Sequence, residues 1–516
     1  MKKTSRIKEA FNVLLGRQPA PNYKLRQLGN LVHHITQRER ARYRNEYGAA
    51  STERRREDWG YETDTPYSEI NSKQPIIMAR SRNLYHNDST YRAAVNTVVT
   101  NCIGEGLWPK PKIKDSKGAL DSKLNKKIEQ MFWDYSNPRQ WDARRKLAFI
   151  GAGQRMALQT IIVSGDIFMN AVIPGRPGSI IPTAWQMFES DRLDKNKDSF
   201  KRSLTSSENV SQTLHGINID EYGAEVSYNI KGIAKPISAR NIIHSYLIDR
   251  PEQYIGMPAA ACVLPETFDR HDLVEDYVLK SRSIAKILWF LSNKNDMAPG
   301  TDDVDSDDVL SLDSLSQMRG EEAPEDIKFP DNINDTLQPL VRMLQHGICS
   351  GLGTSYTTVT RDMDGVNFAA SKFIDIQEWR FYKTLRDFIN YDFNEPFYER
   401  FLEMAILSGK LPEIGAANYV KEPERFKAVE WLGNGKQDVD PLKDRNADDV
   451  GMKNYSLTLG DVVAKAGKDL DDHLDEIQEI NEKLKARGLA PINALAAPNK
   501  EVIDAQLAAQ YQEEGK

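Results

Sequence analysis

The sequence predicts an α+β protein in which a strand-rich middle lies between long helical segments. Candidate strands crowd between residues 167 and 248, where β-branched and aromatic runs alternate with turn residues. Helical periodicity dominates on both sides of that stretch. The chain has 516 residues, more than one hydrophobic core supports. We therefore expect about two to four packed units.

Helical spacing of apolar residues marks the part before the strands. It runs from Leu25 to Ile35 and again from Ile76 to Gly104, where Asn87 and Asp88 are plausible caps. Glycine at 104 ends the second segment. Residues 145–165 predict a further helix.

Four strands are expected next, separated by loops at 175–178 and 206–216. They are Ile167–Ile173, Ile180–Met187, Ala224–Ile230 and Ile242–Ile248.

A long amphipathic helix is predicted over Phe268–Leu291, which contains no Gly or Pro and would be about 36 Å long. A second helix is expected over 335–351, with Pro339 in its first turn, where proline is tolerated. The segment Asn295–Asn334 between them contains Pro and Gly and cannot be a continuous helix. The order is helix, irregular module, helix.

The rest of the chain reads mainly as helix. Residues 368–408 are rich in aromatic residues, and the helix should break near Pro396. The C-terminal third is helical and charged, and it ends in a tail of Ala, Gln and Glu that we expect to be mobile.

Charge is distributed unevenly around a net value of −6. Residues 1–58 contain fourteen Lys or Arg against six acids, whereas residues 296–326 contain eleven acids against one base, Arg319. A basic arm and an acidic segment suggest two different partners or surfaces. Either stretch is also compatible with a solvated segment that binds nothing.

Motifs for catalysis, metals or cofactors are missing from the sequence. It contains no phosphate-binding G-x-x-x-x-G-K-[ST], no H-E-x-x-H, no G-x-S-x-G and no dinucleotide glycine pattern. Cys102, Cys262 and Cys349 lie far apart and fit reduced, buried thiols. No apolar stretch reaches the roughly 18 residues that span a bilayer, and no secretory signal is evident. We expect no enzyme activity, metal, cofactor or membrane contact, and assembly in the cytoplasm.

One acidic run invites a different interpretation. Its carboxylates resemble a divalent-cation site, but the glycine turn and final glutamate of an EF-hand loop are missing. We favour a solvated loop, and give the same interpretation to Asp362–Gly365. The acids of the run are Asp302, Asp303, Asp305, Asp307 and Asp308.

A set of motifs in chain order resembles the lambda-type phage portal family. The most specific is Ile242–Pro258, where a histidine-containing strand is followed by Arg-Pro, Gln and Gly-x-Pro. Lys372 departs from the family, since many relatives have arginine one residue later in a Ser-x-Arg pattern. Residues before 60 and after 490 match no motif. The other segments are Ala79–Leu84, Asn96–Gly106, Ser164–Phe168, Asp191–Leu193, Leu352–Ser371, Trp431–Gly433, Asp438–Lys443 and Gly467–Asp469.

The resemblance implies a portal fold, assembled as a ring of about twelve copies whose parts are called wing, stem, clip and crown. It assigns residues 1–75 to a basic arm with helices, 76–267 to the wing, 268–293 and 335–351 to the two stem helices, 294–334 to the clip, 352–367 to the tunnel loop, 368–439 to a long helical region of the wing, 440–490 to the crown and 491–516 to the tail.

The same resemblance implies a function. The ring would be the head–tail connector at one capsid vertex of a virion, through which double-stranded DNA is packaged and ejected. Its partners would be other copies of the chain in a homododecamer, DNA, the terminase large subunit, a head–tail adaptor, the major capsid protein and scaffold. The acidic run defined above would then be the docking candidate on the clip.

Electrostatics limits how such a channel contacts DNA. A helix of about 36 Å faces roughly twenty phosphates, and a strongly basic wall would hold the duplex tightly. A few weak basic rings are expected instead, with Lys286 and Arg361 as candidates. Asp362, Met363 and Asp364 complete the residues expected to face DNA. Lys286 fits an ion pair with a neighbouring subunit equally well.

Alternatives remain at this level. A metal-dependent, DNA-processing nuclease would use the acidic run, and another structural head component, such as a capsid or scaffold protein, would share the composition. The basic arm fits contact with packaged DNA, with a neighbouring subunit, or with scaffold and capsid proteins.

Overall fold

The computed structural model describes residues 65–115, 118–199, 212–293, 333–365, 367–433, 435 and 441–489. All the elements below belong to one compact unit, Pro66–Lys516. The basic arm, the acidic run at 302–308 and the tail after 490 lie outside the described residues.

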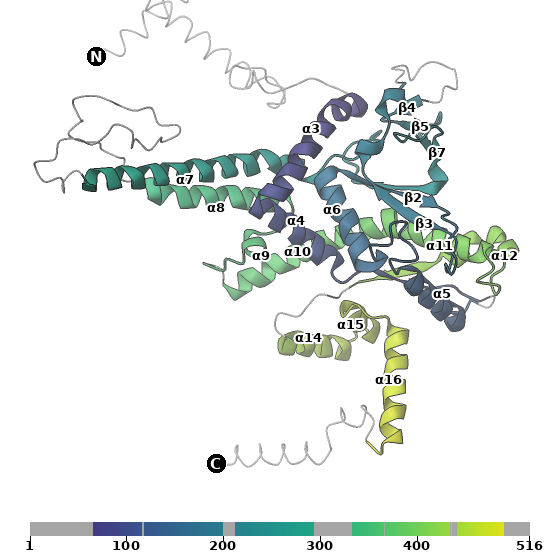
Figure 1. Ribbon diagram of the computed structural model, residues 1–516. Coiled ribbons are helices and arrows are strands. Elements are labelled where there is room, and N and C mark those ends of the chain that lie inside the picture. The colour runs from purple at the N-terminus through teal and green to yellow at the C-terminus, as the bar shows by residue number, and fades with distance from the viewer. Residues whose placement is uncertain are drawn as a thin grey trace, which may run out of the picture. The chain divides into compact units, whose positions relative to one another are not determined.

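Helices and strands are mixed along the chain, which confirms the α+β prediction (Figure 1). The helices are α3 (Pro66–Asn87), α4 (Ser89–Ile103), α5 (Ser122–Tyr135), α6 (Gln154–Ser164), α7 (Leu264–Asn293), α8 (Ile333–Gly351), α9 (Tyr356–Thr360), α10 (Phe368–Ile389), α11 (Glu395–Leu407), α12 (Ala416–Lys421), α13 (Pro423–Lys427), α14 (Pro441–Lys453), α15 (Leu459–Lys465) and α16 (Leu470–Ala486). The strands are β1 (Trp108–Pro111), β2 (Asp166–Val172), β3 (Ala184–Phe188), β4 (Gln212–Leu214), β5 (Ile217–Ile219), β6 (Glu225–Tyr228), β7 (Ile237–Ser238), β8 (Ile242–Tyr246) and β9 (Val429–Leu432).

All the described sheets are antiparallel. Strand β2 is central in the order β3-β2-β8, so that Met169 lies opposite Met187 on one side and Ile243 on the other. A second sheet has the order β4-β5-β6-β7. Strands β1 and β9 form a ribbon that joins the early and late parts of the chain.

Aromatic side chains fill the main core between α5, α6, α11 and the β2 sheet. Phe149 stacks on Phe397 with ring centroids 3.7 Å apart, and Phe132 meets Phe401 edge to face at 5.2 Å. Such pairs add to the free energy that burial of large apolar surfaces provides. A smaller core under the second sheet is built around Phe168, which is fully buried.

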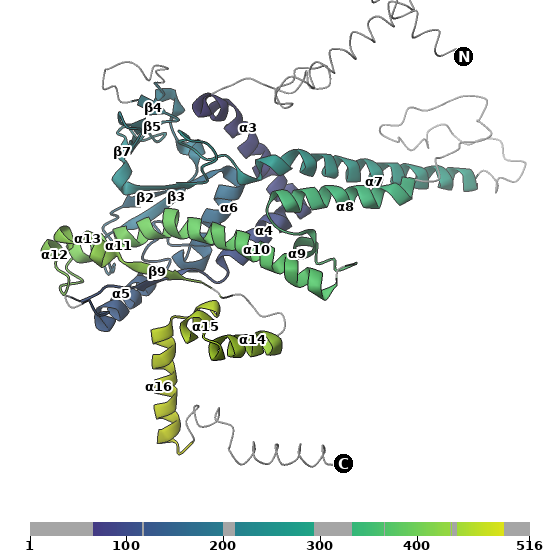
Figure 2. The ribbon, with the colours of Figure 1, turned by 180° about the vertical axis from the view of Figure 1, so that it is seen from behind.

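The helices α7 and α8 lie side by side as a hairpin (Figures 1 and 2). They are antiparallel, because the end of α8 meets the start of α7: a Cβ atom at Gly351 would lie 2.3 Å from the Cγ1 atom of Val263. Glycine therefore permits the close approach at the root. Helix α7 is about 45 Å long and begins before the predicted Phe268, because Pro265 fits in its first turn.

The predicted helix over 145–165 is wrong in its first half, since α6 begins at Gln154. Gly151 has φ +76°, and a Cβ there would lie 2.4 Å from the carbonyl oxygen of Glu105. The buried Gln154 side chain accepts the N–H groups of Leu107 and Gly151, at 2.9 and 3.0 Å. These bonds hold the chain in a turn where local periodicity suggested helix.

The predicted helix break near Pro396 is wrong, because α10 continues through a π-helical turn at Asn390–Asn394 into α11 with αR backbone angles on both sides of the turn. Proline has no N–H for the carbonyl oxygen four residues earlier, that of Asp392. The hydroxyl of Ser245 on β8 donates to that oxygen instead, at 2.9 Å. The π-helical turn thus attaches the long helix to the sheet.

Three further expectations need correction. The long helical region over 368–439 is helical only to Leu407, after which short helices lead to β9. Strand β4 lies inside the expected loop at 206–216. All three cysteines are free, but Cys262 is exposed whereas the other two are buried. Short strands such as β4 carry too few residues for a clear alternating pattern.

Candidate functional site

The root of the hairpin is fixed to the start of α4 by a buried ion pair. Asp88, the predicted cap, accepts the N–H of Tyr91 at 2.7 Å and pairs with Arg270 of α7. The two side chains are 0% and 10% exposed. Gln345 of α8 donates to Thr90 at 3.3 Å, so both hairpin helices are tied to the same turn.

A short loop follows the hairpin and carries four of the predicted residues. Arg361 caps the end of helix α9. Its backbone has φ +61°, and its N–H donates to the carbonyl oxygen of Thr357 at 2.8 Å. The carboxylate of Asp362 accepts the N–H of Asp364 and the hydroxyl of Tyr356, both at 3.1 Å. These bonds, with the nearby Arg342 at 3.5 Å, lower the pKa of Asp362. The loop is therefore tethered rather than free.

Aromatic and cationic contacts attach this loop to α8. The ring of Tyr356 is largely buried and stacks on His346 with centroids 4.4 Å apart, while the guanidinium of Arg342 lies 5.2 Å from the ring centroid. Tyr356 and Arg342 border a hollow of about 510 Å³ between α7, α8 and α9. The loop is thus attached to α8 by side-chain contacts.

A buried carboxylate holds the other end of α9. Glu378 of α10 accepts the N–H of Ser355 and the hydroxyl of Thr358, the latter at 3.0 Å. The hydroxyl of Thr354 also lies 3.4 Å from it. Helix α9 is therefore fastened at its start to both α10 and α8, and Asp362, just after its end, is held by α8 again.

The structure brings some predicted residues together and not others. Arg361, Met363 and Asp364 are exposed beside Asp362. In the part of the chain that the structure describes, the Arg361 side chain forms no ion pair or hydrogen bond. Lys286 lies on α7, but its side chain is outside the described residues, as is the acidic run at 302–308.

Two residues of this site, Arg342 and His346, were missed in the sequence, whereas Tyr356 was recognised only as part of the family motif. The spacing of Tyr356 and Asp362 inside the motif at 352–371 was a usable signal for their contact. Arg342 is the only Lys or Arg in α8, which also marked it. Nothing local indicated that His346 would stack on Tyr356.

The described residues contain no group of three or more His, Cys, Asp or Glu side chains suited to a metal ion. Among the described helices, none is both long and apolar enough to cross a membrane.

The family model described as phage portal protein, lambda family, matches residues 52–386. The chain belongs to this portal family. The match includes α7, α8 and the loop after α9, and it confirms the resemblance seen in the motifs.

Relatives of this portal protein are distant in sequence. A protein named probable portal protein from Halomonas phage phiHAP-1 is 23% identical over 417 residues, which is 75% of this chain and 76% of that protein. The solved structure titled neck of native GTA particle has a TM-score of 0.35 at 12% identity, covering 77% of this chain and 99% of that one. The virion of native gene transfer agent particle gives 0.33 at 11% identity, covering 81% and 94%. These TM-scores are too low to carry an argument.

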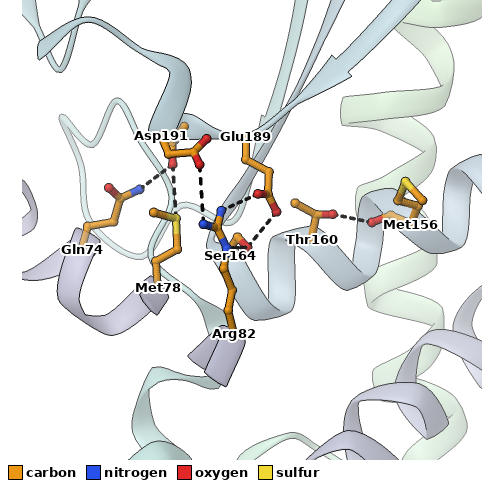
Figure 3. A network of polar contacts seen from close by, with 9 residues as sticks. Gln74, Met78, Arg82, Met156, Thr160, Ser164, Glu189 and Asp191 are labelled. Carbon is orange, nitrogen blue, oxygen red and sulfur yellow. Dashed lines mark hydrogen bonds and ion pairs between the residues drawn. The ribbon is translucent and has the colours of Figure 1, made fainter. Parts of the chain in front are cut away.

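Residues from several portal motifs meet in one network of polar contacts, called the polar node, which is centred on Arg82 of α3 (Figure 3). Arg82 pairs with Glu189, lies 3.6 Å from Asp191 and donates to the hydroxyl of Ser164 at 3.0 Å. The Ser164 hydroxyl also lies 3.0 Å from Glu189. The motifs at 79–84, 164–168 and 191–193 thus join α3, α6 and the end of β3.

The most specific portal motif packs against the same node. A Cβ at Gly256 would lie 2.0 Å from the carbonyl oxygen of Gly165, so neither position has room for a side chain. Asp166 accepts the N–H of Gly256 at 3.2 Å, and Gln74 donates to the carbonyl of Gly256 at 3.1 Å. Burial raises the pKa of Asp166 to about 6. These motif residues shape the fold that carries the hairpin.

Proposed function

We propose that this portal protein forms a ring of about twelve copies at one capsid vertex, through which double-stranded DNA enters and leaves the head. The observation that carries the proposal is the family match, which spans both hairpin helices and the loop that follows them. In this proposal the hairpin forms the wall of the passage.

The charges of the hairpin suit a wall along which DNA slides. Helix α8 contains one acid, Asp335, and one Lys or Arg, Arg342, which is engaged with Asp362 and Tyr356. Most exposed charges in the described part of α7 are acidic before residue 277, and the half-buried Lys280 and the exposed Arg282 follow. A basic wall that engaged about six to ten phosphates would bind DNA tightly, with a steep dependence on salt, and this binding would stall transport. A sparse set of cations allows movement.

The loop after α9 supplies a weak contact of the expected kind. Arg361 is an exposed cation with the carboxylates of Asp362 and Asp364 close to it in the chain. In a ring, each of these side chains is repeated in every subunit, so a weak contact becomes a ring of weak contacts. We propose that Arg361, Asp362, Met363 and Asp364 face the duplex.

Other assignments remain predictions. They include Lys286 as a second basic ring or as an ion pair between subunits, and the acidic run at 302–308 as a docking site on the clip. The terminase large subunit, a head–tail adaptor, the major capsid protein and scaffold are the proposed partners.

Native mass spectrometry of the purified full chain, with negative-stain images, tests the proposal. We expect a closed ring near twelve copies with a central hole. A stable monomer that cleaves plasmid DNA with magnesium would support a nuclease instead. Closed shells or filaments without a central hole would point to another structural head component.

A further inference from the structure

A second surface, away from the hairpin, concentrates unpaired positive charge. Between α5 and α6, residues 139–146 contain four cations, Arg139, Arg144, Arg145 and Lys146, against one acid, Asp142. All four cations are exposed, whereas Asp142 is 7% exposed. We call residues 139–146 the basic loop.

The acid in the basic loop is used by the backbone and does not neutralise the cations. Asp142 accepts the N–H groups of Arg144, Lys146 and Leu147 at 2.9, 2.8 and 3.1 Å. Its carboxylate is therefore turned toward the main chain. Within the described residues, none of the four cationic side chains forms an ion pair or a hydrogen bond.

The basic loop is anchored to the core on both sides. Trp141 is buried and donates its ring N–H to the carbonyl of Leu147 at 2.6 Å. The backbone of Ala143 donates to Trp185 of β3 at 2.9 Å. Arg176, from the turn after β2, donates to the carbonyl oxygens of Asp142, at 3.0 Å, and Ala143.

The path of the chain is unusual at the centre of this loop. Arg145 has φ +60°, a left-handed conformation that residues other than glycine seldom adopt and that surrounding contacts must impose. Its N–H donates to the carbonyl of Asp142 at 3.1 Å, which fixes that conformation. The cations are thus presented by a rigid turn, so little conformational entropy of the backbone is lost when they bind an anion.

We propose that the basic loop binds the phosphate backbone of duplex DNA, at a site separate from the loop after α9. The inference rests on the proposed function, which brings DNA to this chain. Residues 144–146 lie within at most about 10 Å of one another along the chain, and DNA presents a phosphate on each strand about every 3.4 Å along its axis. The three cations therefore match a short row of phosphates.

The chemistry of the loop favours nucleic acid over an acidic protein. Stable protein interfaces depend on aromatic or aliphatic anchors that fill pockets. The basic loop offers none, since Trp141 is buried and Ala143 is the only other apolar residue from 140 to 146. Guanidinium groups match phosphate oxygens in a bidentate geometry, which suits a contact made of cations alone.

The test is a salt titration of DNA binding by the full-length protein. Affinity for a short blunt-ended duplex is measured by fluorescence anisotropy from about 50 to about 200 mM NaCl. The variant R144A/R145A/K146A should reduce the slope of log K against log salt by about two to three, and weaken binding about tenfold or more near 100 mM. The variant R144Q/K146Q leaves Arg145 and its backbone conformation in place and should reduce the slope by about two.

A matched control removes equal charge elsewhere. K235A/K410A/K421A replaces three exposed lysines whose side chains form no ion pair or hydrogen bond within the described residues, and it should change the slope by less than about one. Unchanged slopes in both loop variants, with rings still formed in native mass spectra, would overturn this inference and leave the proposed function intact. Loss of poly-glutamate binding with unchanged duplex binding would also overturn it, in favour of an acidic protein partner. Failure of the wild-type chain to form rings would count against the proposed function alone, because the salt slopes are measured on any assembly.

Discussion

The root of the hairpin and the basic loop use arginine in opposite ways. At the root, Arg270 is buried against Asp88, and each charge compensates the desolvation of the other. In the basic loop, the carboxylate of Asp142 accepts hydrogen bonds from backbone N–H groups. Arg144 and Arg145 remain exposed, and their side chains have no partner within the described residues. A buried acid can therefore fix a distant arginine, as Asp88 does, or bind backbone N–H groups and leave neighbouring arginines free for a partner, as Asp142 does.

The loop after α9 is intermediate between these two regions. Asp362 is only half-exposed and its oxygens are occupied by Tyr356, Asp364 and Arg342, yet the neighbouring Arg361 is exposed. The same few residues thus combine a tether to the hairpin with a cation that is open to solvent. Three predictions test this graded comparison.

Breaking the root pair should have the largest effect. Asp88→Ala leaves the Arg270 charge buried without its partner and removes the cap of α4, so the free energy of unfolding should fall by about 3–5 kcal/mol. Urea unfolding followed by tryptophan fluorescence measures it. Lys127→Ala, which breaks an exposed pair with Glu413, is the control and should cost less than about 1 kcal/mol. Equal effects of the two variants would show that the root pair is not special.

A buried acid without a neutralising partner should make stability depend on pH. Burial raises the pKa of Asp166 to about 6 from its ordinary 3.8. Between these values the unfolded chain releases the proton while the folded chain keeps it, so this group's stabilising contribution is complete below about pH 4 and is lost as the pH rises through 6. Asp166→Asn removes the titration. The wild type should therefore lose up to about 3 kcal/mol relative to this variant between pH 4 and pH 7.

Urea unfolding of both proteins at the two pH values measures that difference. Asp134→Asn, on the exposed side of α5, provides the control and should shift the unfolding free energy by less than about 0.5 kcal/mol at either pH. A difference between wild type and Asp166→Asn that stays constant with pH would contradict the prediction.

The loop after α9 should affect DNA binding and leave stability almost unchanged. Arg361→Ala should lower the slope of log K against log salt by about one. Asp362→Asn removes a negative charge beside Arg361 and should raise DNA affinity. Arg361→Ala should unfold within about 0.5 kcal/mol of the wild type, because its side chain lies at the surface. Asp362→Asn weakens the carboxylate's contacts with Tyr356 and Arg342 and should cost up to about 1 kcal/mol. The salt titration described for the basic loop measures both effects. Slopes equal to that of the wild type in both variants would show that the loop after α9 does not contact DNA.

Much of the architecture was predictable because it depends on near neighbours in the chain. The Asp88 cap and the two hairpin helices follow from side-chain spacing and from backbone rules that act over a few residues. The ordered motifs predicted the family, which the match over 52–386 confirms. The boundaries failed at Gln154 and β4, where a buried amide and a short strand depend on distant partners.

The sequence alone thus determined the α+β class, the long helices, the uneven charge and the family. Only the tertiary structure decided that Arg270 would be buried while Arg144 and Arg145 would stay unpaired, and that Arg342, His346 and Tyr356 would hold Asp362. The physical reason is that helix periodicity and capping act between residues close in the chain, whereas burial and charge pairing depend on which distant segments pack together.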